Sequence, residues 1–174
     1  NNIIDNSKIE IRCEECGHRI LDDLYVLSSN NIIDVKYDLI GEITIPSNIN
    51  GIEVKGIGAE AFKNCRNLQE IIIPNTATNI DSSAFENCSY LQSVTLSSSL
   101  VAIGSSAFKG CASLESISIP NSVTHIDTSA FEECSYLQSV TLSNNLIAIG
   151  SSAFKGCASL ARITIPNTVT NIDT

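Results

Sequence analysis

The chain has 174 residues, a net charge of −9 and 43% hydrophobic residues, with 26 Ile but no Trp or Met. A core of branched aliphatic side chains favours stacked strands over a helical bundle. The acidic charge and the lack of a Lys/Arg cluster exclude nucleic acid and an anionic membrane surface as expected partners. No stretch approaches the roughly 18 apolar residues of a membrane-spanning helix, so no membrane insertion is expected. The N-terminal residues also lack the basic and apolar regions of a signal peptide.

Residues 1–40 do not follow the repeat pattern of the later chain and are predicted to form an N-terminal cap. Two segments within them, 24–27 and 32–35, have the β-branched and apolar composition of short strands. The cap is expected to cover the open face of the first repeat.

The cap contains a short cysteine motif, Cys13-Glu-Glu-Cys16-Gly17-His18. Its spacing is that of a knuckle that places two thiolates on one metal ion, yet it supplies only half of a zinc site. Three interpretations stay open: free thiols or a local disulfide, a zinc knuckle completed by other sequence or by a second chain, and redox activity. No cofactor is predicted, and Cys13, Cys16 and His18 are the residues that a zinc ion would use.

Residues 41–174 repeat themselves every 23 residues. A longer period is superimposed, because residues 75–120 and 121–166 differ at only 11 of 46 positions, so two kinds of repeat alternate. An Ala-Phe dipeptide, a Cys and a Leu recur in every unit. The Phe, Cys and Leu columns are Phe62, Phe85, Phe108, Phe131 and Phe154; Cys65, Cys88, Cys111, Cys134 and Cys157; and Leu68, Leu91, Leu114, Leu137 and Leu160.

Each unit combines two patterns. Its first part, Leu-x-x-Ile-x-Ile, alternates apolar and polar residues and predicts a strand. Its second part shifts to spacings of three and four, which predicts a short helical or 3₁₀ turn, and Ser83-Ala-Phe-Glu86 fits a capping box. The corner residues Asp81, Asp127 and Asp173 are interpreted as turn caps. A calcium row is disfavoured because a coil with Gly at this corner separates each pair by about 10 Å.

A 23-residue unit cannot enclose a core alone, so neighbouring units must stack. The predicted fold is a repeat solenoid, a right-handed β/α superhelix of five to six coils. A parallel sheet is expected on one face, with short helical or 3₁₀ turns and short strands on the other. The pattern stops at Thr174, where Ser-Ala-Phe is due, so the last coil is expected to be incomplete. A fragment of a longer array, or self-association through this uncapped coil, would account for it.

The pattern Leu-x-x-Ile-x-Ile-Pro, followed by Ala/Val-x-x-Ile-Gly/Asp-x-x-Ala-Phe-x-x-Cys, resembles the BspA-like class of leucine-rich repeats over about residues 40–174. Five extra residues between Pro46 and Val54 match a feature common in the first repeat of that family. The resemblance implies an extracellular or cell-surface bacterial protein that mediates adhesion or protein binding and has no shared catalytic residues. A structural spacer, or a carrier module for a domain outside this chain, is the alternative.

No nucleophile, base and orienting partner occur together, so no catalytic residue and no enzyme activity are predicted. The expected binding surface is the concave strand face, whose small hydroxyls suit weak, multivalent contacts with a protein, a host or matrix ligand, or a glycan. Its outward positions are Glu70, Ile72, Ser93, Thr95, Ser116, Ser118, Ser139, Thr141, Arg162 and Thr164.

Two further residue types bear on function. The repeat cysteines are expected to be buried, unreactive thiols rather than a disulfide or metal ladder. Tyr90 and Tyr136 occupy equivalent repeat positions, and they are either packed between coils or partly exposed.

Overall fold

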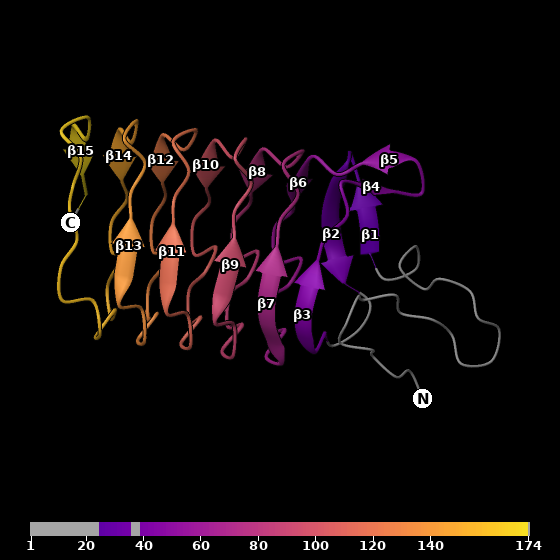
Figure 1. Cartoon of the computed structure of the whole chain (residues 1–174), viewed down its shortest axis with the longest axis horizontal. Helices are drawn as coiled ribbons and strands as arrows, with labels where there is room; N and C mark the ends of the chain where they lie inside the picture. Colours follow the sequence, from indigo (N-terminus) through magenta and orange to yellow (C-terminus); the bar gives the residue numbers. More distant parts are fainter. Residues whose placement is uncertain (1–24, 36–38, 174) are drawn as a thin grey trace.

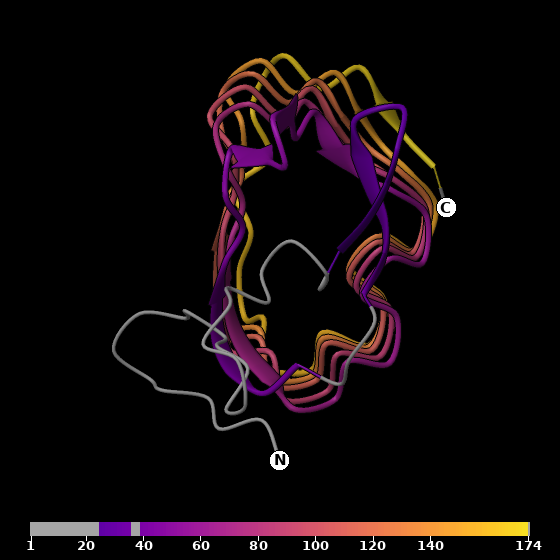
Figure 2. The ribbon, with the colours of Figure 1, turned by 90° about the vertical axis from the view of Figure 1, so that its right-hand side faces the viewer.

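The computed structural model describes residues 25–35 and 39–173. The chain winds into a stack of similar coils (Figure 1). Seen along the stack, successive coils follow nearly the same elongated outline (Figure 2). The predicted repeat solenoid with parallel strands is therefore confirmed.

Long strands occupy one side of the stack and pair in parallel. They form a three-stranded sheet, β3-β7-β9, and a two-stranded sheet, β11-β13. Partners lie one repeat apart, as in Ile71 opposite Val94. The bounds are β3 (Gly41–Thr44), β7 (Leu68–Ile72), β9 (Ser93–Thr95), β11 (Ser116–Ser118) and β13 (Ser139–Thr141).

Short strands form an eight-stranded sheet on the other side, in the order β1-β2-β6-β8-β10-β12-β14-β15. Each repeat adds one two-residue strand whose second residue is an Ile, so the predicted short strands are confirmed. This Ile is buried in every coil but the last, where Ile172 is exposed. The bounds are β1 (Tyr25–Ser28), β2 (Asn31–Val35), β6 (Gly56–Ile57), β8 (Asn79–Ile80), β10 (Ala102–Ile103), β12 (His125–Ile126), β14 (Ala148–Ile149) and β15 (Asn171–Ile172).

The two strands predicted before the repeats exist as β1 and β2, which pair antiparallel. β2 also pairs in parallel with β6, and its Ile32 is fully buried opposite Ile57. These strands therefore continue the sheet of the first coil. The prediction that residues 1–40 form a cap stays a prediction, because residues 1–24 and 36–38 lie outside the described part of the chain.

The five extra residues of the first repeat form a small hairpin of β4 (Asn48–Ile49) and β5 (Ile52–Glu53). Its turn residues Asn50 and Gly51 have φ values of 54° and 80°. Two positive φ angles at an Asn-Gly pair are typical of the type I′ turn that closes two-residue hairpins. Ile49 of β4 is buried in the core, whereas both residues of β5 are exposed.

The core is a set of columns that run along the stack. The five Phe rings lie one above another with centroid separations of 4.9, 5.1, 5.4 and 5.4 Å. Ile, Leu and Ala columns pack around them, and almost all are buried from Ile43 to Leu146. Because each column copies one small set of residues, the core needs neither Trp nor Met.

The predicted helical or 3₁₀ turn is instead a run of tight turns, and no helix occurs in residues 25–35 or 39–173. Within residues 83–88, every second N–H donates to the carbonyl three residues back, at 3.1 to 3.3 Å. The alternate N–H groups of Ser83, Phe85 and Asn87 donate to carbonyls of the next coil, at 2.7 to 2.9 Å. In a helix the N–H groups point along the axis toward carbonyls of the same coil, so this segment would then make no backbone hydrogen bonds to the next coil. The capping-box interpretation is wrong for the same reason, since Ser83 is at φ 57° in a turn.

Candidate functional site

The outward positions of the long strands form aligned rows across the sheets. Glu70 lies opposite Ser93 and Ile72 opposite Thr95, and the same register places Ser116 beside Ser139. We call the ten predicted outward positions the strand face. Eight of its residues are exposed and two, Glu70 and Ser93, are half-buried. The last two, Arg162 and Thr164, lie in an extended segment that is not part of a strand.

The strand face is chemically simple. Hydroxyl groups of Ser and Thr dominate it, and Ile72, at 38% exposure, is its one large apolar residue. Hot spots of tight protein interfaces are typically Trp, Tyr or Arg in enclosed pockets. This surface can therefore supply many hydrogen bonds to an extended ligand, but offers Arg162 alone as an anchor of that type.

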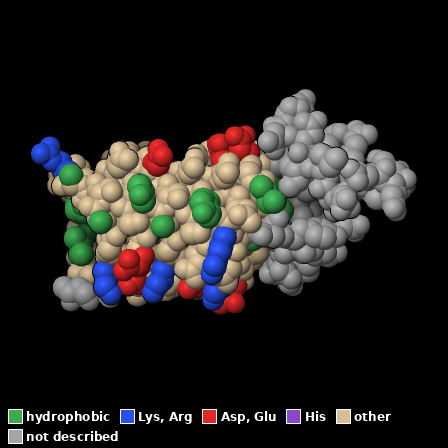
Figure 3. All heavy atoms as spheres, turned by 90° about the horizontal axis from the view of Figure 1, so that it is seen from below, with side chains coloured by type: hydrophobic (Ala, Val, Ile, Leu, Met, Phe, Trp, Pro, Cys, Tyr) green, Lys and Arg blue, Asp and Glu red, His purple; other side chains and the backbone are tan. Residues whose placement is uncertain are grey.

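A ladder of alternating charges runs along one edge of the solenoid, and the sequence analysis missed it. It consists of Lys63, Glu86, Lys109, Glu132 and Lys155, one residue per coil at steps of 23. Figure 3 shows the blue and red side chains alternating along this edge. Lys63 Nζ lies 3.2 Å from Glu86 Oε2, and Glu132 contacts Lys109 at 2.8 Å and Lys155 at 3.1 Å. The sequence signal was the alternation Lys, Glu, Lys, Glu, Lys directly after each Phe.

Hydrogen bonding within this charge ladder shifts the ionisation of its members. Hydrogen bonds from Lys109, Lys155 and Ser129 lower the pKa of the Glu132 carboxyl to about 2. Burial opposes ionisation of Glu86, but hydrogen bonds from Ser83 and Lys63 outweigh it and lower its pKa. Like charges in adjacent coils, about 5 Å apart, would repel each other. The charge ladder therefore gives a physical reason for two alternating kinds of repeat.

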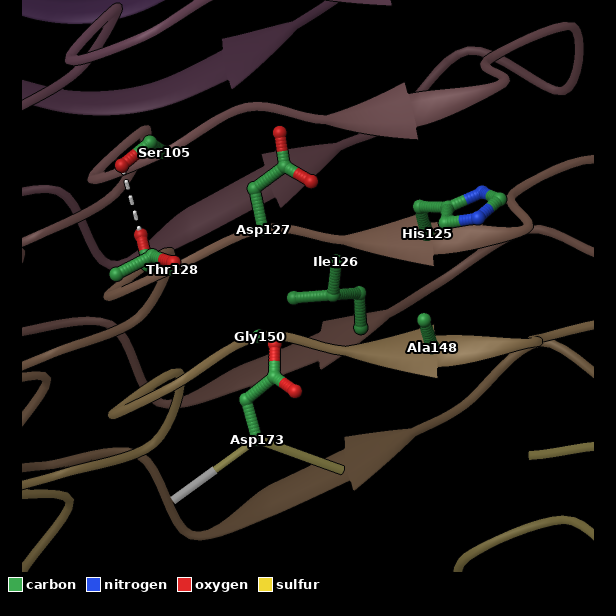
Figure 4. Close-up of a pocket in the computed structure, with 8 residues that line it drawn as sticks. All are labelled: Ser105, His125, Ile126, Asp127, Thr128, Ala148, Gly150 and Asp173. Atoms are coloured by element: carbon green, nitrogen blue, oxygen red, sulfur yellow. Dashed lines mark hydrogen bonds between the residues drawn. The ribbon is translucent and has the colours of Figure 1, made fainter. Parts of the chain in front are cut away.

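A second alternation, of Asp and Gly, accompanies two shallow hollows beside the short strands. Gly150 lies between Asp127 and Asp173 and lines the hollow shown in Figure 4. An equivalent hollow lies over Gly104, between Asp81 and Asp127. Carboxylates two coils apart, at about 10 Å, do not share one ion. In the part of the chain that the structure describes, no group of three or more metal-ligating side chains comes together.

The predicted capping of a helical turn by the corner Asp side chains is not what the structure shows at Asp81. The Ala84 N–H donates to the Asp81 backbone carbonyl at 3.3 Å. The Asp81 carboxylate instead accepts a hydrogen bond from Asn79 Nδ2 at 2.8 Å. In the next similar coil His125 replaces Asn79 and contacts Thr124 Oγ1 instead, at 2.8 Å.

The cysteine column is structural. Cys88, Cys111, Cys134 and Cys157 are free thiols, and each Sγ donates to the carbonyl of the Phe 26 residues earlier, at 3.0 to 3.2 Å. Burial raises the pKa of all four thiols, that of the half-buried Cys157 to about 11. These observations confirm the prediction of buried thiols for this column. The motif with Cys13, Cys16 and His18 lies outside the described residues.

Tyr90 and Tyr136 stand out from the surface, with 59% and 64% of their area exposed. The interpretation that they pack between coils is therefore wrong. Both residues lie in the turn that precedes a long strand.

Comparison with solved structures identifies bacterial leucine-rich repeat proteins. The T. pallidum leucine-rich repeat protein is 28% identical, with a TM-score of 0.77, over 86% of this chain and 78% of that one. A leucine-rich cell surface protein from Faecalibacterium prausnitzii A2-165 is 29% identical, with a TM-score of 0.62, over 86% of this chain and 48% of that one. The pneumococcal vaccine antigen PcpA, at 23% identity and a TM-score of 0.68, shares the fold over 86% of this chain and 43% of its own.

The family of the chain follows from a family model, since no curated protein sequence matches the chain. Among the described residues, no helix is long and apolar enough to cross a membrane. The family model described as BspA type leucine rich repeat region matches residues 55–174 in six copies. Leucine-rich repeats are generally binding scaffolds without catalytic activity. With most of its length matched in this way, the chain belongs to the BspA-type leucine-rich repeat family.

Proposed function

We propose that the chain is a non-enzymatic adhesion or protein-interaction module of a bacterial cell-surface or secreted protein. In this proposal residues 1–40 cap the array formed by residues 41–174, and the strand face binds the ligand. The observation that carries it is the in-register alignment of outward side chains from strand to strand. Family membership and the description of one relative as a cell surface protein support the location.

The expected ligand is a protein or a host or matrix component, contacted through many weak hydrogen bonds. Small hydroxyls lose little side-chain entropy on binding, yet each contributes little affinity. Many copies on one surface would raise the overall avidity by orders of magnitude without any new contact. Binding should therefore depend steeply on the density at which the protein is displayed.

A structural spacer or carrier module is the second candidate. The near identity of residues 75–120 and 121–166, with 11 differences in 46 positions, favours it. A spacer requires coils that stack regularly and no conspicuous binding surface.

Beads coated with the intact chain at graded densities would distinguish these functions. The probes are fibronectin, laminin, collagen and cultured epithelial cells. We expect binding that rises steeply with density and falls at least about tenfold when Ser118→Lys and Thr141→Lys are combined, because two long charged side chains then stand on the strand face. The matched control combines His125→Lys in β12 and Thr170→Lys directly before β15, both exposed and away from the strand face, and should keep binding. Absence of binding to every probe at the highest density would favour the spacer.

A further inference from the structure

Two exposed tyrosines mark a surface separate from the strand face. Tyr90 and Tyr136 occupy the same repeat position, 46 residues apart, and both are mostly exposed. They lie in the turns before β9 and β13, at the lower ends of the long strands in Figure 1. Figure 3 views this lower surface, where hydrophobic side chains form separate patches.

Backbone hydrogen bonds between coils hold the two tyrosines at a defined spacing. Ser113 N–H donates to Ser89 O at 3.2 Å, and Tyr136 N–H donates to Ala112 O at 3.0 Å. The two tyrosines are therefore two coil steps apart, about 10 Å at the usual strand spacing. Ser113 occupies the equivalent position of the coil between them, and its small side chain leaves a gap between the two rings.

Polar side chains accompany this row. Gln92, Glu115 and Gln138, each two residues beyond a member of the row, are all exposed. They offer amide donors and carbonyl or carboxylate acceptors next to the aromatic rings. Aromatic faces beside such groups suit ligands that have an apolar face and a hydroxylated rim.

We propose that Tyr90 and Tyr136 form a two-platform binding site for an extended, neutral, β-1,4-linked glycan. Such a chain presents the same sugar face at every second residue, an interval close to the two-coil spacing of the rings. The C–H face of one sugar stacks on each ring, and hydroxyls at the sugar rims hydrogen-bond to Gln92, Glu115 and Gln138. The sugar between the two platforms passes over Ser113.

Two observations favour this ligand over others. Protein hot spots lie in enclosed, well-packed pockets, whereas these two rings are mostly exposed and have exposed polar residues nearby in the sequence. The net charge of −9 disfavours an anionic glycan. The site uses no residue of the strand face, so it does not depend on the proposed adhesion function.

The test uses the intact chain with β-1,4-linked oligosaccharides of glucose and of N-acetylglucosamine, two to six units long, titrated by NMR. Six-unit chains should shift the Tyr90 and Tyr136 ring signals and bind more tightly than disaccharides, which reach one platform. We expect Tyr90→Ala or Tyr136→Ala to weaken six-unit binding about fivefold, and the double variant to abolish it. Tyr90→Phe and Tyr136→Phe should bind within about twofold of the parent, because they keep the ring.

The matched control is Ser159→Ala, which alters the same repeat position without removing a ring and should bind normally. Each variant is checked by circular dichroism, and the exposure of both rings predicts unchanged folding. The proposal is overturned if the parent binds neither oligosaccharide series, or if the double alanine variant binds as the parent does. Loss of matrix-protein binding by that variant, without any glycan binding, would assign the tyrosines to a protein interface and also overturn it.

Discussion

The stacked Phe column allows a direct test of how neighbouring coils share stability. Phe108 is fully buried between two rings, with centroids 5.1 Å from Phe85 and 5.4 Å from Phe131. Truncating a buried Phe to Ala costs about 3–5 kcal/mol, and each ring contact contributes about 0.5–1.5 kcal/mol. We therefore expect Phe108→Ala to lower the free energy of unfolding by about 5 kcal/mol.

Phe154 provides the matched comparison, because it has the same place in its repeat. It is only half-buried, and Phe131 is its one ring partner among the described residues, at 5.4 Å. With about half the burial and half the ring contacts, Phe154→Ala should cost about 2 kcal/mol. Urea unfolding followed by circular dichroism measures both values. Equal losses, or a larger loss at Phe154, would refute the idea that stability sums over neighbouring coils.

Three further predictions concern single contacts. The folded-state pKa of Glu132 is about 2, below its ordinary value of 4.5, so its stabilising effect is present at neutral pH and is lost between about pH 5 and pH 2. The urea midpoint of the parent should therefore fall as the pH is lowered through this range, and Glu132→Gln should make that fall smaller. The same pH profile in both proteins would contradict the ion pairs. Alkylation at pH 8, followed by peptide mapping, should label the half-buried Cys157 well before the buried Cys111. Equal labelling rates would argue against burial of the cysteine column and against the raised pKa of its thiols. Gly150→Ala would place a Cβ 2.5 Å from Thr128 N, so it should cost about 1–3 kcal/mol in the same unfolding assay, and a neutral effect would mean that the coils separate easily.

Much of the fold was predictable because the repeat pattern is also the packing pattern. An apolar residue recurring every 23 positions faces the same core in every coil, so the Phe, Leu and Cys columns could be assigned without a structure. The strand positions followed from alternation in segments such as Leu68–Ile72. Stacking was required because one unit cannot bury its own apolar face.

The turn segment shows where local patterns misled the prediction. The spacing of Ala84, Phe85 and Cys88 resembles that of a helix, and Ser83 with Glu86 resembles its cap. The segment forms turns because half of its N–H groups bond to the next coil. A local spacing rule contains no information about a partner that lies 22 residues away.

Of the candidate surfaces, too, one was predicted from the sequence and one was found only in the structure. The strand face was identified in advance, because outward positions alternate with core positions along each strand. The alternation of Lys and Glu after each Phe is visible in the sequence, but only the structure shows that these residues pair across coils, as Lys109 and Glu132 do.

The sequence by itself determined the repeat length, the core columns, the strand positions and the family resemblance, because each is written into every copy of the repeat. Only the tertiary structure decided that the turns bond to neighbouring coils, that Lys and Glu alternate within contact distance, and that Tyr90 and Tyr136 are exposed. These features depend on which residues of the adjacent coil lie beside a given residue. The stacking of the coils determines those neighbours, and the sequence of one repeat alone does not contain them.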